Sequence, residues 1–118
     1  MKVDGFSFFV KAKNAVPNTQ NSLPVINMGG VVSTENNYVK FTTTGAATVK
    51  VTYFQGGAGR YCKIIGADGK DVASDETDKT TADKALHTGT MSISSAGTYY
   101  LGSANSGIYI TEVSVTLK

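Results

Sequence analysis

The stretch from Tyr38 to Ser74 is the feature that most constrains the fold of this 118-residue chain. Apolar residues alternate in it with Lys, Arg and Thr, and Gly-rich segments interrupt the alternation. Successive side chains of a β-strand point to opposite faces, so a period of two is typical of strands. The stretch therefore predicts four short strands, whose inward side chains are Val39, Phe41, Ala47, Val49, Val51, Tyr53, Cys62 and Ile64.

The opposite parity of the same strands carries polar side chains, namely Lys40, Lys50, Tyr61 and Lys63. The Gly-rich segment 55–59 gives the backbone freedom for Arg60 to approach a ligand or a neighbouring segment. Asp68-Gly69 predicts a hairpin with a type I′ turn, which needs two positive-φ residues. We expect a basic, partly aromatic outer surface next to a continuous core.

The remaining chain predicts further strands at 5–11, 23–27, 30–33, 89–95, 98–102 and 108–117. Segment 12–22, which contains Pro17, predicts a loop. Segment 75–88 is the most polar part and predicts a solvated loop, with a helical turn over 82–86 as the alternative.

The closing segment 108–117 is long for a strand, which predicts a bulge or a central position. We predict that one face of this strand carries Tyr109, Thr111, Val113, Val115 and Leu117. About eight to nine short strands at regular spacing predict an all-β fold. We expect one antiparallel β-sandwich, jelly-roll-like, over residues 1–118.

Composition excludes several classes of protein. Hydrophobic residues make up 41% and charged residues 17%, as in a folded globular domain. A net charge of +2 is too small to predict a nucleic-acid partner, and no apolar run reaches the ~18 residues that span a membrane. Cys62 is the one cysteine, so it predicts a buried thiol rather than an internal disulfide.

Catalytic and metal motifs are also missing from the sequence. His87 is the one histidine, which excludes a Ser–His–Asp triad made from it and a His-rich metal site. No serine lies in a GxSxG context. Carboxylates in the acidic loop 75–83 leave calcium open, but a solvated acidic loop is the alternative because the known calcium-loop pattern is lacking. We expect a non-enzymatic domain without metal or cofactor.

Three segments together resemble the small β-sandwich modules appended to bacterial pectate lyases and related pectin-degrading enzymes. They are YVKFTTTGAATVKVTYF, GRYCKIIGADGKDVAS and SSAGTYYLGSANSGIYITEVSVT, and the resemblance covers about residues 5–117. It implies a non-catalytic carbohydrate-binding module that recognises pectic polysaccharide through basic side chains. It also implies a secreted, larger protein in which a pectate lyase or esterase domain is attached. Because residues 1–14 lack a cleavable signal pattern, we expect export to depend on another part of that protein.

Polygalacturonate carries one carboxylate per sugar, so a surface that binds it needs several cations. The parity of the strands predicts such a binding site at Lys40, Lys50, Arg60, Tyr61 and Lys63, and Phe54 offers further apolar contact. The alternative is that consecutive strands cross to opposite sheets, in which case these residues do not share one surface. A structural or adhesive sandwich domain that contacts protein is the alternative function. A lyase or hydrolase acting alone is a more distant one, because 118 residues leave little room for a cleft.

Overall fold

The computed structural model describes residues 2–4, 9–11, 14–20, 23–55, 57, 59–75 and 86–118. Its strands are β1 (Lys2–Asp4), β2 (Phe9–Lys11), β3 (Asn14–Gln20), β4 (Leu23–Met28), β5 (Tyr38–Thr43), β6 (Ala47–Gln55), β7 (Cys62–Gly66), β8 (Asp71–Ser74), β9 (His87–Ile93), β10 (Gly97–Ser103) and β11 (Ile108–Leu117). The described residues contain no helix of the length and hydropathy needed to cross a membrane.

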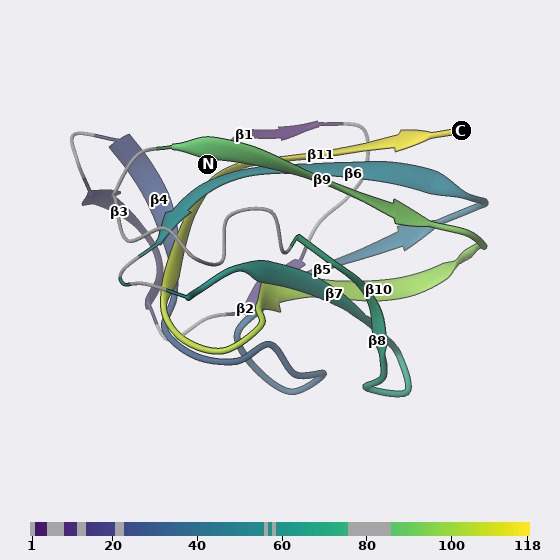
Figure 1. The fold of residues 1–118 in the computed structure, drawn as a ribbon, viewed down its shortest axis with the longest axis horizontal. Coiled ribbons are helices and arrows are strands. Elements are labelled where there is room, and N and C mark those ends of the chain that lie inside the picture. Colours follow the sequence, from purple (N-terminus) through teal and green to yellow (C-terminus); the bar gives the residue numbers. More distant parts are fainter. Residues whose placement is uncertain are drawn as a thin grey trace.

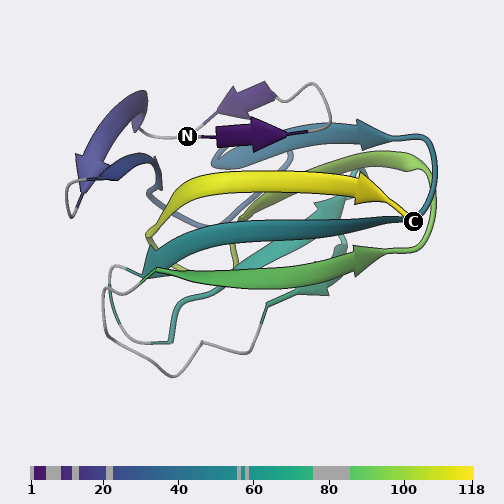
Figure 2. The same ribbon diagram turned by 90° about the horizontal axis from the view of Figure 1, so that it is seen from above.

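The strands form two layers, one with β11, β6 and β9 and the other with β5, β10 and β7 (Figure 1). The first sheet has the order β3-β4-β11-β6-β9, with the short β1 parallel to β11. The second has the order β2-β5-β10-β7-β8. Figure 2 shows β11, β6 and β9 side by side in the first sheet.

The connections identify the type of sandwich. From β4 to β11 the chain crosses to the other sheet at every connection except the β7–β8 hairpin. As a result β11 lies beside β4, and β10 lies beside β5. This nesting of late strands against early ones is that of an eight-stranded jelly roll, so the predicted all-β, jelly-roll-like sandwich is confirmed.

The core lies between the two sheets, and the parity predicted for the stretch from Tyr38 to Ser74 is confirmed. Its four strands are β5 to β8, and all eight predicted inward side chains are at most 1% exposed. Removing such alternating apolar side chains from water is the main stabilising term of the sandwich. The free thiol of Cys62 is buried among them, as expected.

Two predicted segments differ. The predicted loop 12–22 contains the strand β3, which pairs with β4 at the edge of its sheet. Its register shifts between Asn14 and Asn18, which is where Pro17 lies, and proline is tolerated at such an edge irregularity. The predicted strand 30–33 is a single bridge between Val31 and Ser103.

Other boundaries are shifted or lie outside the described residues. The strand predicted at 89–95 begins two residues earlier, as β9, and the strand predicted at 98–102 is one residue longer at each end, as β10. Of the strand predicted at 5–11, residues 9–11 are described as β2. The helical turn predicted over 82–86 falls on residues that, apart from Leu86, lie outside the described chain.

The hairpin between β7 and β8 is confirmed, but its turn is of another type. Gly69 has a φ of 80°, and Asp68 has a negative φ. The N–H of Gly69 donates to the carbonyl of Gly66, whose own N–H donates to Lys70. This is a type I turn followed by one left-handed residue, which places the glycine at a bulge.

A bulge in β11 reverses its parity. Ile110 pairs with Tyr53 and Glu112 pairs with Thr52, so Thr111 is the additional residue. Val113 and Val115 face the core as predicted. Tyr109 does not, because it precedes the bulge, and Leu117 at the end of the strand is 46% exposed.

Tyr109 stacks instead on Phe54, with ring centroids 4.9 Å apart. Phe54 is 1% exposed. The prediction that Phe54 offers an apolar contact to sugars is therefore wrong.

Candidate functional site

The outer face of the second sheet gathers aromatic and basic side chains from three adjacent strands. We define the Tyr–Lys face as Tyr38 and Lys40 on β5, Tyr100 on β10 and Lys63 on β7. All four are partly exposed, because their parity is opposite to that of the buried neighbours in each strand. The jelly-roll order places β10 between β5 and β7, and so places Tyr100 between the two lysines.

Tyr100 is the centre of this face. It pairs directly with Lys40 across the ladder, and the Lys40 ammonium lies 5.7 Å from the centroid of its ring. That distance is within the range of a cation–π interaction. The ring of Tyr38 meets that of Tyr100 edge-on, with centroids 5.0 Å apart. The rings of Tyr38 and Tyr100 therefore pack against each other, and the ring of Tyr100 also contacts the Lys40 ammonium.

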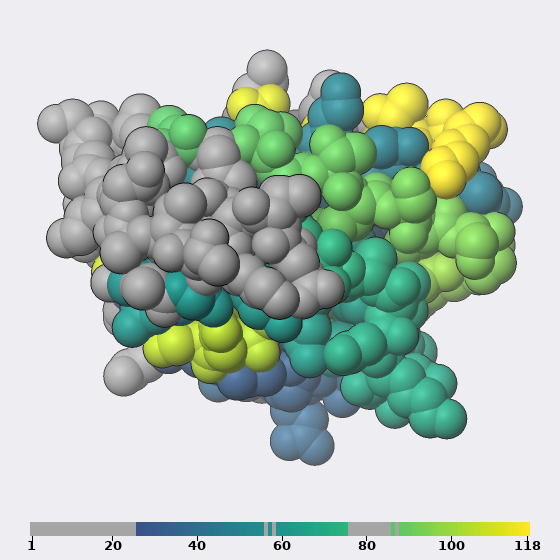
Figure 3. Space-filling model, in the orientation of Figure 1, coloured from purple at the N-terminus to yellow at the C-terminus, as the bar shows by residue number. Residues whose placement is uncertain are grey.

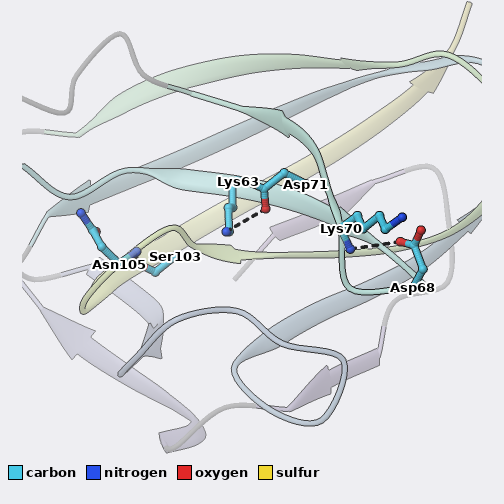
Figure 4. A network of polar contacts seen from close by, with 6 residues as sticks. All are labelled: Lys63, Asp68, Lys70, Asp71, Ser103 and Asn105. Atoms are coloured by element: carbon cyan, nitrogen blue, oxygen red, sulfur yellow. Dashed lines mark hydrogen bonds and ion pairs between the residues drawn. The ribbon is translucent and has the colours of Figure 1, made fainter.

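Lys63 lies two strands from Lys40 and one cross-strand row away, because it pairs with Gly102 rather than Tyr100. Ordinary strand spacing puts their Cα atoms about 12 Å apart. The Lys63 ammonium forms an ion pair with Asp71 of β8, at 2.9 Å (Figure 4). The face thus carries two cations, of which one is paired with a carboxylate.

A loop covers Gly102 of β10 and leaves no room for a side chain at this position. A Cβ there would lie 2.5 Å from the carbonyl oxygen of Asn37 and 2.8 Å from Cβ of Val32. Val32 is 4% exposed and its N–H donates to Ser103, so this loop is packed on the sheet. The segment before β5 therefore bounds the Tyr–Lys face on the side of Tyr38.

Lys50 does not belong to this face. It lies on β6, in the other sheet, where its neighbours across the ladder are Ser114 and Thr90. Its side chain is exposed, as predicted, but on the opposite side of the sandwich. The predicted grouping of Lys50 with Lys40 and Lys63 is therefore wrong.

Arg60 and Tyr61 lie in the connection before β7, at one end of the sandwich. The guanidinium of Arg60 donates to the carbonyl of Gly107 at 3.1 Å, and the carbonyl of Arg60 accepts from Gln55 at 2.7 Å. The carbonyl of Tyr61 accepts from the N–H of Ala104. Arg60 thus joins two turns, and neither residue lies on a strand of the Tyr–Lys face.

A cluster of hydrogen-bonded residues, Tyr53, Asp75 and Cys62, lies inside the sandwich. The hydroxyl of Tyr53 donates to Oδ2 of Asp75 at 2.8 Å and accepts from the N–H of Cys62 at 3.4 Å. Asp75 is 2% exposed, and its carboxylate packs against Gly89 of β9. Burial, together with the nearby carboxylate, raises the pKa of the Tyr53 hydroxyl and of the Cys62 thiol far above their ordinary values.

The raised pKa values predict a loss of stability in alkali. The unfolded chain releases these protons near pH 8.5 for a thiol and 10 for a phenol, while the folded chain keeps them. Each group therefore makes its full contribution to the free energy of unfolding below the pKa of its unfolded form. This contribution decreases as pH rises above that value, by up to about 1.4 kcal/mol per pH unit for each group. Urea unfolding between pH 7 and 10.5 measures this. We expect a smaller decrease for Tyr53→Phe, and an equal one would contradict the assignment.

Asp75 is the one residue of the predicted acidic loop 75–83 whose side chain is described, and it faces the core. Residues 76–83 lie outside the described chain. Within the described part, no three His, Cys, Asp or Glu side chains group as metal ligands, and no pocket is found. Comparison of the sequence with protein-family models and with curated proteins finds no match. The resemblance to pectate-lyase modules stays a prediction.

Two residues of the Tyr–Lys face, Tyr38 and Tyr100, were not predicted as site residues, and neither was Asp71, the ion-pair partner of Lys63. Parity alone could have found the two tyrosines, because Tyr38 shares the parity of Lys40, and Tyr100 is opposite in parity to the buried Tyr99 and Leu101. Asp71 gave no such signal. Its position depends on an irregularity in the pairing of β8 with β7.

Proposed function

We propose that this domain binds acidic polysaccharide, of the pectic type, on the Tyr–Lys face. The observation that supports this is the placement of the Tyr100 ring beside Tyr38 and under the Lys40 ammonium, with Lys63 two strands from Lys40. Sugar rings present apolar C–H faces that pack on aromatic rings, and uronic acids add a carboxylate at the edge of the ring. A polymer of such sugars matches both parts of the face.

The energetics call for several contacts at once. An exposed ion pair contributes about 0–1 kcal/mol, so neither lysine binds a carboxylate tightly by itself. A polymer offers many carboxylates in sequence, which makes repeated weak contacts effective. In the larger secreted protein that we infer, such binding holds an attached pectin-degrading domain near plant cell wall.

Affinity electrophoresis tests this function. We expect gels that contain unesterified polygalacturonan to retard the protein at low salt and much less at 0.5 M salt, since salt screens exposed charges. Fully methyl-esterified pectin, which has the same sugar backbone without the charge, is the matched control and should retard it little. Xylan, glucan and mannan complete the panel. Equal migration in all gels at low salt would contradict the proposal.

A further inference from the structure

Asp71 reaches the Tyr–Lys face through a bulge in β8. Ile64 pairs with Ala73 and Ile65 pairs with Asp71, so Val72 is an additional residue in the ladder. A bulge of this kind re-aims the neighbouring side chain. Here it brings the carboxylate of Asp71 to the ammonium of Lys63, and Figure 4 shows the two side chains pointing toward each other.

The bulge also completes a cross-strand row. Lys40 pairs with Tyr100, Tyr100 pairs with Ile65, and Ile65 pairs with Asp71. The row crosses β5, β10, β7 and β8 and spans three strand spacings, about 14 Å. Its two ends differ in charge, with an ammonium at β5 and a carboxylate at β8. A ligand that lies along the row meets the cation of Lys40 and the ring of Tyr100, passes over Ile65, which is 3% exposed, and then reaches the anion of Asp71.

The ion pair at the β8 end is open to exchange. The side chain of Asp71 is 72% exposed, while that of Lys63 is 19% exposed. Solvent reaches the carboxylate freely, so the pair belongs to the weak, exposed class. An incoming carboxylate can therefore replace Asp71 at Lys63, but it then lies next to a displaced like charge.

We propose that Asp71 is an internal competitor that sets which acidic polymers the Tyr–Lys face prefers. It holds the ammonium of Lys63 in the absence of ligand, and it repels a second carboxylate at the β8 end of the row. Its oxygens accept hydrogen bonds, which suits the hydroxyl groups of a neutral sugar. The preferred ligand is a chain in which acidic sugars are separated by neutral or esterified ones. This inference rests on the proposed binding function.

A second carboxylate on the β7–β8 hairpin, that of Asp68, provides a control for the substitution of Asp71. Asp68 lies on the turn of the same β7–β8 hairpin, where its Oδ1 accepts from the N–H of Lys70 at 3.0 Å (Figure 4). The hairpin projects from the body of the molecule in Figure 3. Asp68→Asn removes the same charge as Asp71→Asn and keeps an acceptor oxygen for Lys70. Among the described residues, Lys63 and Asp71 are the one ion pair of this hairpin.

The experiment is a titration of wild type, Asp71→Asn and Asp68→Asn with two polymers at low salt. One is unesterified polygalacturonan, and the other is the same polymer with about half of its carboxyls methyl-esterified. We expect Asp71→Asn to bind the unesterified polymer about three- to fivefold tighter than wild type. Its affinity for the half-esterified polymer should change by less than twofold, and Asp68→Asn should resemble wild type with both.

The outcomes separate the two proposals. Equal affinities of wild type and Asp71→Asn for the unesterified polymer, with binding retained, would overturn the competitor role alone. Equal gains for Asp71→Asn and Asp68→Asn would overturn it as well, because the effect would then be one of net charge. If none of the three proteins binds either polymer at low salt, the proposed function fails and this inference fails with it.

Discussion

Replacement of Gly89 by alanine is expected to lower the free energy of unfolding by about 3 kcal/mol, through overpacking and damage to a buried hydrogen bond. A Cβ at this position would lie 2.5 Å from Cγ of Asp75 and would overlap its Oδ2. Asp75 has little room to withdraw, because it is 2% exposed and its Oδ2 accepts from Tyr53. Urea unfolding followed by circular dichroism measures the difference.

Gly45→Ala is the matched control. No atom lies within 4 Å of a Cβ built at Gly45, and its φ is not in the left-handed region. We expect Gly45→Ala to stay within about 0.5 kcal/mol of wild type, as surface changes away from special features do. A Gly89→Ala protein as stable as Gly45→Ala would contradict the packing of Asp75 against β9.

A double-mutant cycle ties the effect to the carboxylate. Asp75→Ala alone leaves the Tyr53 hydroxyl without this acceptor and should cost about 1–3 kcal/mol. In that background the Cβ of Gly89→Ala no longer meets the carboxylate and keeps only the 3.0 Å contact with Cβ of residue 75, so the second change should cost about 1 kcal/mol. The two substitutions should therefore be strongly non-additive. Additive effects would show that Gly89 is sensitive for another reason.

The core of this protein was predictable from its sequence because the signal is local. Buried side chains alternate with more exposed ones throughout β5, in β6 as far as Tyr53, and in β7 from Cys62 to Ile64. Within these runs the parity of one residue determines that of the others. Val39 and Phe41, for example, are both buried, and Lys40 between them is not. Strand parity needs no knowledge of partners, which is why every inward prediction in this stretch holds.

The errors occur where pairing partners decide the outcome. The bulge at Thr111 arises from the ladder with β6, and it reverses the side of Tyr109 relative to the second half of β11. The strand β3 forms in spite of Pro17 because β4 offers an edge to pair with. The turn at Gly69 is likewise of another type than predicted and one residue longer, which follows from how β7 and β8 meet.

The same distinction explains the candidate site. Parity correctly predicted that Lys40, Lys50 and Lys63 point outward, but it does not assign a strand to a sheet. Because β5 and β6 are consecutive strands that cross between sheets, Lys40 and Lys50 point away from opposite sides of the sandwich. The ion pair of Lys63 with Asp71 could not be predicted from strand parity either, since it depends on the bulge in β8.

The separation of the lysines leads to the largest binding effect that we expect. The double variant Lys40→Gln/Lys63→Gln should bind unesterified polygalacturonan about tenfold more weakly at low salt, or not measurably, since two exposed charge contacts of up to about 1 kcal/mol each are lost. Its affinity should also depend less on salt than that of wild type. Titration in 20 mM and 200 mM salt measures both quantities.

Lys50→Gln is the control, because it removes a positive charge from the other sheet and leaves the Tyr–Lys face intact. At about 20 Å or more from Lys63, across two sheets packed some 10 Å apart and their outward side chains, its charge is largely screened. We expect this variant to bind within about twofold of wild type. If Lys50→Gln weakens binding as much as the double variant, attraction by net charge explains the affinity, and the Tyr–Lys face is not the binding site.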